Sequence, residues 1–331
     1  MTTRLQQFER TIRRDPAGRG LIATEPQHGP LCEGHLASAA RDLAERGGRV
    51  GIVTGFYIPH AEVPAAETDG PPGAVLLARV LNALGMKAGI ITDGFCAPAV
   101  KAAADFVDLP PESVRVVEVA DYQPSIINHR PFSHLIAVER VGPNHTRDSI
   151  ARQSAGNGAV VSRFESAVPD ERRDRCHNMQ GDVIDEFTAP LHRLFEDRAA
   201  LAPDGRTIGI GDGGNEIGMG TIDWHELVQR LPPGHAACVP CRIATDWTIV
   251  AGTSNWGAEA LAACVALLKD RVDVLERFDC AFQERLLEHV VQHGPAVSGI
   301  TGRREPVVDG LPFITYIQPW AGIRRLLGLI E

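Results

Sequence analysis

Short apolar runs alternate with helical patterns along much of the chain. Four runs rich in β-branched residues predict buried strands at 47–56, 87–93, 113–121 and 133–142. Helical patterns fall between the first three of these runs, at 74–85 and 97–107. Continuous apolar strands that alternate with helices are typical of a parallel sheet covered on both faces. We therefore predict an α/β fold, with a mostly parallel sheet and helices on both faces.

The same patterns extend to both ends of the chain. An amphipathic helix is predicted at the start, with Leu5, Phe8 and Ile12 on one face. The second half predicts a strand and glycine loop at 205–220, one or two strands within 238–252, and helices at 254–270, 273–294 and the C-terminus. The middle, 144–205, is rich in charge and polar turns, with a helical pattern at 182–201. We expect one large domain spanning 1–331, in which 144–205 is a helical and loop insertion.

Composition narrows the class of partner. The net charge is -9 and aromatic residues make up 5% of the chain, so a nucleic-acid partner is not expected. No apolar run approaches the length of a membrane span, and the first residues lack the apolar core of a secretory signal. We expect a cytoplasmic protein that makes no membrane contact and binds a small molecule.

Cysteine and histidine offer little sign of a metal site. The seven cysteines are an odd number, which favours reduced thiols over a disulfide framework. Cys238 and Cys241 have the spacing of half a zinc site or a redox pair, but no second pair completes it, so we interpret them as small apolar strand residues. We expect the twelve histidines to be scattered, with none paired at a metal-ligand spacing such as His-x-x-x-His.

Polar residues that follow predicted strands are the candidates for chemistry, because ligands of open α/β sheets bind outside the carboxyl ends of the strands. Glu67, Thr68, Asp69 and Gly70 come after the first strand and precede a helix, whose free amides can hold an anion. Asp69 is suited to bind a cation or act as a base. The structural alternative is that these acids cap the helix and complement its dipole.

Two further strand ends carry polar groups. Glu139 and Arg140 follow the fourth strand, where they either contact substrate or form a surface ion pair. Asp93 ends the second strand, where it is either a turn former or a catalytic residue. Ser254 and Asn255 begin a predicted helix, and either cap it or help to bind a carboxylate at its amino end.

The strongest local signal is the loop at 209–220, in which six of twelve residues are glycine. Glycine allows a ligand to approach the backbone closely, and successive N–H groups, such as those of Gly213 and Gly214, can form an anion-binding nest. Asp212, Asn215 and Glu216 add proton carriers or ligands to the same loop. The loop matches neither a P-loop nor a dinucleotide fingerprint, so no nucleotide cofactor is expected.

Five segments together resemble the C-terminal domain of D-glutamate cyclase and its stand-alone bacterial relatives: TGFYIP (54–59), ETDGPPGA (67–74), GDGGNEIGMG (211–220), VAGTSNWGAEAL (250–261) and VDGLP (308–312). The resemblance runs from about residue 15 to the end. It implies a carbon–oxygen lyase, a hydro-lyase that converts D-glutamate to 5-oxo-D-proline and water, and a divalent metal such as Mn²⁺ or Mg²⁺. The animal enzyme has an additional N-terminal hydro-lyase-like domain that is not in this chain. The activity is therefore expected to need either that domain or a separate hydro-lyase-like partner protein, unless the chain acts alone.

These observations lead to specific assignments. Asp69, Asp212 and Glu216 are the predicted catalytic residues and also the predicted metal ligands. The predicted substrate-binding residues are Glu67, Thr68, Gly70, Glu139, Arg140, Gly213, Gly214, Asn215, Ser254 and Asn255. A homodimer is expected from base rates alone. Two other functions stay open: a magnesium-dependent enzyme acting on a phosphorylated small molecule, and a non-catalytic metabolite-binding module.

Overall fold

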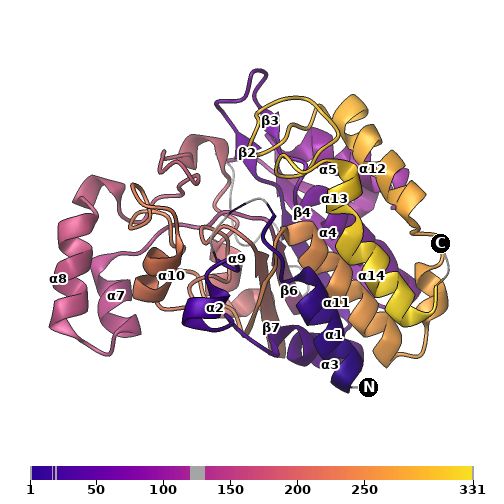
Figure 1. The fold of residues 1–331 in the computed structure, drawn as a ribbon, viewed down its shortest axis with the longest axis horizontal. Helices are drawn as coiled ribbons and strands as arrows, with labels where there is room; N and C mark the ends of the chain where they lie inside the picture. Colours follow the sequence, from indigo (N-terminus) through magenta and orange to yellow (C-terminus); the bar gives the residue numbers. More distant parts are fainter. Residues whose placement is uncertain (1, 17, 19–20, 120–130, 330–331) are drawn as a thin grey trace.

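A six-stranded parallel sheet organises the part of the chain that the structure describes. The computed structural model describes residues 2–16, 18, 21–119 and 131–329 (Figure 1). The strands run in the order β5-β4-β1-β6-β7-β8, with every neighbouring pair parallel. They are β1 (Arg49–Thr54), β4 (Lys87–Asp93), β5 (Val114–Val117), β6 (Phe132–Val138), β7 (Leu201–Gly211) and β8 (Trp247–Val250). A short antiparallel hairpin stands apart from the sheet: β2 (Tyr57–Ile58) and β3 (Ala65–Ala66). The predicted α/β fold is confirmed.

The helices are distributed along the whole chain. The α-helices are α1 (Thr2–Ile12), α2 (Glu25–His28), α3 (His35–Arg46), α4 (Pro71–Ala83), α5 (Ala97–Phe106), α7 (Arg147–Gln153), α8 (Gly158–Ala167), α9 (Arg193–Glu196), α10 (Trp224–Arg230), α11 (Ser254–Leu268), α12 (Cys280–His293), α13 (Phe313–Tyr316) and α14 (Gln318–Leu327). Short 3-10 turns are η1 (Pro111–Ser113), η2 (Asp170–Arg172), η3 (Asp185–Phe187), η4 (Arg198–Ala200) and η5 (Val272–Leu275). Among the described residues, none of these helices combines the length and the apolar character needed to traverse a bilayer.

The two faces of the sheet are covered differently. Val50 and Ile52 of β1 join one apolar cluster with residues of α1, α3, α4 and α11, whereas Val53 joins a second cluster on the opposite face. This alternation follows from the two-residue period of a strand. The long helices gather over the first face, and α9, α10 and connecting loops lie over the second (Figure 1). Helix α11 packs against α3, α4, α1 and α14, and is buried on all sides from Ser254 to Ala266.

Three predicted elements differ from the observed ones. The helix predicted at 273–294 is interrupted, and α12 begins only at Cys280, because Asp279 caps it by accepting the Phe282 N–H (2.6 Å). The helical pattern at 182–201 forms only η3, α9 and η4, since Pro190 lacks an N–H and disfavours helix at the residue before it.

The segment 238–252 yields strand only at β8. Cys238 and Cys241 are buried free thiols outside the named strands, so their interpretation as strand residues was wrong. All seven cysteines are free, as expected. Of the strand predicted at 113–121, residues 120 and 121 lie outside the described residues.

The order of the strands determines where a ligand can bind. From β1 the chain moves to β4 and β5 on one side, and then returns to place β6 on the other side of β1. The connections that follow β1 and β6 therefore diverge, which opens a crevice at the carboxyl ends of these two strands. The loops after β1, β6 and β7 carry most of the residues that the sequence marks for chemistry.

Candidate active site

Asp69, in the loop between β3 and α4, lies over the first turn of α11. Its carboxylate accepts N–H bonds from Gly70 (3.0 Å), Ser254 (2.7 Å) and Asn255 (2.8 Å). The first amides of a helix have no partner within the helix, and the positive end of its dipole favours a carboxylate there. The amides of Ser254 and Asn255, expected at a substrate carboxylate, are thus bonded within the protein.

Asn255 ties the loop before α4 to the start of α11. Its Oδ1 accepts the N–H groups of Gly70 (3.0 Å) and Gly73 (2.8 Å), and its Nδ2 donates to the carbonyl of Thr68 (3.1 Å). Gly70 has φ +94, and a Cβ atom there would lie 2.8 Å from the Cβ of Glu139. Only glycine fits this backbone and this close approach. The segments after β1, β6 and β8 are therefore locked together.

Arg140 is directed away from this junction and into the protein. Its guanidinium donates to Asp93 (2.6 Å) and to the carbonyls of Gly55 (2.9 Å) and Ala189 (2.7 Å), and the residue is 1% exposed. Burial by itself lowers the pKa of Arg140, but the Asp93 carboxylate outweighs it and holds the pKa above its ordinary value. Arg140 and Asp93 form a buried ion pair that braces the loops, in place of the surface ion pair or substrate contact considered from sequence.

Glu139 is held in a different environment from its neighbour. It has φ +44, which is uncommon for a residue with a side chain, and it is 3% exposed. The Ser254 hydroxyl donates to its Oε2 (2.6 Å). Backbone strain of this kind costs on the order of 1–3 kcal/mol and gathers at functional sites. The turn at Glu139 aims one carboxylate at the crevice while Arg140 is buried behind it.

The glycine-rich loop after β7 binds its own carboxylate. Glu216 accepts the N–H groups of Asp212 (3.0 Å) and Gly213 (2.6 Å) at Oε1 and of Gly214 (2.7 Å) at Oε2. The amide nest that the sequence suggests for a substrate anion is therefore filled by Glu216. Asn215 donates from Nδ2 to the carbonyl of His177 (2.8 Å), which ties the loop to the segment before α9.

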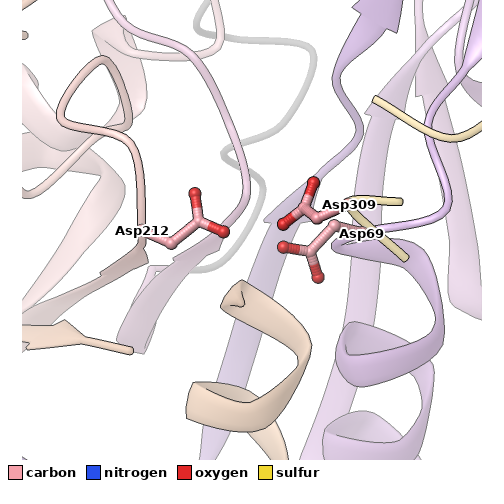
Figure 2. A group of neighbouring side chains, drawn as sticks. All are labelled: Asp69, Asp212 and Asp309. Atoms are coloured by element: carbon pink, nitrogen blue, oxygen red, sulfur yellow. The ribbon is translucent and has the colours of Figure 1, made fainter. Parts of the chain in front are cut away.

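Three aspartates from distant segments meet above α11. Carboxylate oxygens of Asp69, Asp212 and Asp309 lie within 4.8 Å of one another, and all three residues are buried. Figure 2 shows Asp69 and Asp309 side by side, with Asp212 facing them from the loop after β7. A second group, Glu139, Asp212 and Glu216, meets the same limit. Asp212 belongs to both groups and is the centre of the acidic site.

Asp309 was not among the predicted site residues. It lies in the C-terminal segment VDGLP, far from any strand end, with φ +52. Nearby, the Thr68 hydroxyl donates to the Val307 carbonyl (2.6 Å), which brings this segment to the loop before α4. The only sequence signal for Asp309 was its place in one of the segments of the family resemblance.

A cavity of about 400 Å³ adjoins the acidic site. Its wall includes Glu67, Glu139 and Asn215, so the loops after β1, β6 and β7 share one hollow, as expected. The remaining lining residues are Phe56, Ile58, Pro59, His60, Asn178, Met179, Gln180, Gly299, Ile300, Thr301 and Gly302. The volume suits a small metabolite. Glu139 belongs both to this wall and to the second acidic group, which joins the cavity to Asp212.

The position of Glu67 depends on the absence of a side chain at Gly299, which also lines the cavity. A Cβ atom built on Gly299 would lie 2.1 Å from Glu67 Oε2. The carboxylate therefore rests directly against the backbone of Gly299. Residue 67 also pairs with Val297 in an isolated bridge, so the segment after α12 positions one acidic wall of the cavity.

Comparison with known proteins identifies the family of the chain. The chain is 29% identical over 345 residues to the human protein named "D-glutamate cyclase, mitochondrial", and the match covers 94% of this chain. The match covers 49% of that curated relative, so the chain spans about half of its length. The family model described as "D-glutamate cyclase-like, C-terminal" matches residues 8–157 and 163–319. Because that match covers most of its length, the chain belongs to the D-glutamate cyclase-like C-terminal family.

Proposed function

We propose that this chain is a carbon–oxygen lyase that converts D-glutamate to 5-oxo-D-proline and water. The observation that carries the proposal is the joined site: buried carboxylates at the carboxyl ends of the strands, beside a cavity of about 400 Å³. The family supports a D-glutamate cyclase-like activity, and the human relative carries that name. The identity of the substrate and of the product is tested by an assay of the purified chain.

The reaction makes clear demands on the protein. The α-nitrogen forms a bond to the carbon of the γ-carboxylate, which is the δ-carbon of glutamate, and the bond from that carbon to one of its two oxygens breaks. The ammonium group loses two protons, and both end on the departing oxygen, which leaves as water. The enzyme therefore needs a group that takes a proton and returns it, and a pocket that bends the substrate so that its ends meet.

Glu139 is the best placed proton carrier. It lines the cavity, and its Oε2 accepts a hydrogen bond from the Ser254 hydroxyl (2.6 Å), which fixes the orientation of the carboxylate. A negative wall of Glu67 and Glu139 attracts the substrate ammonium. Asp69 and Glu216, by contrast, have their carboxylates bonded by several backbone amides, so we assign neither as the proton carrier. Glu216 supports the backbone of Asp212, and Asp69 joins the loop before α4 to the start of α11.

The aspartate cluster fits a divalent cation. Asp69, Asp212 and Asp309 each offer a carboxylate oxygen, and Mg²⁺ and Mn²⁺ prefer oxygen donors. These three residues would hold such an ion. When bound, it would act as a Lewis acid toward the γ-carboxylate. The ion would also relieve the mutual repulsion of three carboxylates within 4.8 Å.

The decisive experiment incubates the purified chain with D- or L-glutamate, with and without Mn²⁺, and measures the chirality of any 5-oxoproline. We expect product from D-glutamate only. We expect Asp212→Asn and Glu139→Gln to lose at least about a hundredfold in turnover while remaining folded. Asp148→Asn is the matched control, because its side chain is 79% exposed on α7 and belongs neither to the cavity wall nor to either acidic group.

Other outcomes separate the remaining functions. Tight binding of D-glutamate without product, unchanged by the two amide substitutions, supports a metabolite-binding module. Thermal stabilisation by a phosphorylated metabolite and Mg²⁺, with none by glutamate, supports an enzyme acting on phosphorylated molecules. Either result contradicts the cyclase proposal for this chain.

A further inference from the structure

The last turns of α12 carry two histidines on one face. His289 and His293 are four residues apart, and their ring centroids are 4.4 Å apart with planes tilted by 39°. His289 is half-buried and also contacts the Phe106 ring, at 5.1 Å, whereas His293 is exposed. The expectation that no histidine pair has the His-x-x-x-His spacing was therefore wrong, because residues 289–293 read HVVQH.

The geometry of this pair suits one metal ion. Residues four apart on a helix are neighbours on its surface. A zinc–nitrogen bond is about 2.0–2.1 Å long, so two imidazole nitrogens on one ion are separated by roughly 3 to 4 Å. The two ring centroids are 4.4 Å apart, which is close enough for one nitrogen of each ring to approach that separation. Imidazole is a ligand suited to Zn²⁺, Cu²⁺ and Ni²⁺.

The electrostatic surroundings also favour a cation. His293 is the last residue of α12, where the negative end of the helix dipole attracts positive charge. Asp105 on α5 interacts electrostatically with His289, so a negative charge lies nearby to compensate an incoming cation.

We propose that His289 and His293 form a second metal site, for a borderline transition-metal cation such as Zn²⁺, Cu²⁺ or Ni²⁺. At this site two imidazole nitrogens and water molecules would coordinate the ion, whereas Asp69, Asp212 and Asp309 offer only carboxylate oxygens as ligands. The two sites therefore differ in the class of ion that they select. This inference does not depend on the proposed cyclase activity.

The test uses the full chain without an affinity tag, in excess Mg²⁺ to reduce the binding of Zn²⁺ at the oxygen site of Asp69, Asp212 and Asp309. Calorimetric titration with Zn²⁺ is expected to show a micromolar site in the wild-type protein. His289→Gln and His293→Gln are each expected to weaken it by more than about tenfold, since even outer-shell partners contribute about 10- to 100-fold. With Cu²⁺, the electron paramagnetic resonance spectrum is expected to show coordination by two nitrogens that is lost in both variants.

The chain offers a matched control on α10. His225 has Gln229, not histidine, four residues later, and their side-chain Nε2 atoms are 3.0 Å apart. His225→Gln is expected to leave the Zn²⁺ affinity unchanged. If His289→Gln perturbs the fold through the loss of the contact with Phe106, the His293→Gln variant still tests the metal site, because the His293 side chain is exposed. Wild-type Zn²⁺ affinity in His293→Gln, or a Cu²⁺ spectrum unchanged by that substitution, would overturn the proposal.

Discussion

Replacement of Glu216 by glutamine examines whether the glycine-rich loop is built around its own carboxylate. Glu216 accepts three backbone N–H groups, from Asp212, Gly213 and Gly214. Hydrogen bonds to a charged group contribute about 1.5–3 kcal/mol each, and neutral ones about 1 kcal/mol. Glutamine keeps one oxygen, which can serve the two donors now at Oε1, but its NH₂ group faces the Gly214 N–H and cannot accept it.

The magnitude follows from these bonds. One charge-assisted bond is lost and two become neutral, which together cost about 3–5 kcal/mol in the free energy of unfolding. At roughly 2 °C per kcal/mol for a domain of this size, Glu216→Gln should lower the Tm by about 6–10 °C. We expect turnover to fall as well, because the Asp212 backbone loses its support.

Scanning calorimetry at one scan rate measures the shift, with Glu165→Gln as the control. Glu165 is 39% exposed and pairs with Arg147 on the surface, so its loss should cost at most about 1 kcal/mol. A Tm for Glu216→Gln within about 2 °C of the wild-type value, with the control equally unaffected, would show that the loop does not depend on this carboxylate.

Three further predictions concern other parts of the fold. Asp93→Asn leaves the buried Arg140 guanidinium without its counter-charge and should cost about 3–5 kcal/mol in urea denaturation; a cost under about 1 kcal/mol contradicts the proposed bracing role. Burial, with a smaller effect from a neighbouring arginine, lowers the pKa of His145 to about 3, so the unfolded state takes up a proton first as the pH falls below 6.5. This residue should remove up to about 1.4 kcal/mol of stability per pH unit between pH 6.5 and about 3, and His145→Gln should show a shallower decline over that window, whereas equal slopes would refute the assignment. Gly299→Ala should displace the Glu67 carboxylate and lower turnover, with a Tm near that of the wild type; unchanged kinetics would show that Glu67 does not need that position.

The sequence alone was informative where a local signal and the tertiary structure agree. Apolar β-branched runs identified the strands, because strands of a parallel sheet are buried on both faces. Residues that follow strands were expected to lie together, since the carboxyl ends of parallel strands share one edge, and Glu67, Glu139 and Asn215 do meet around one cavity. The pair His289 and His293 was equally visible in the sequence and was missed.

The tertiary structure decided which polar atoms are engaged and which segments meet. Sequence position cannot reveal that Glu216 fills its own amide nest, or that Asp69 takes the amides of Ser254 and Asn255. The bonds of Asp69 join loops that are far apart in the chain, and the bonds of Glu216 form only when its own loop folds back on itself. Asp309 joins Asp69 and Asp212 because the C-terminal segment crosses back over the strand ends, and a contact at that separation leaves no periodic mark in the sequence. Local patterns determine the elements because they reflect burial of each strand and helix, whereas the site depends on long-range packing that only the folded chain specifies.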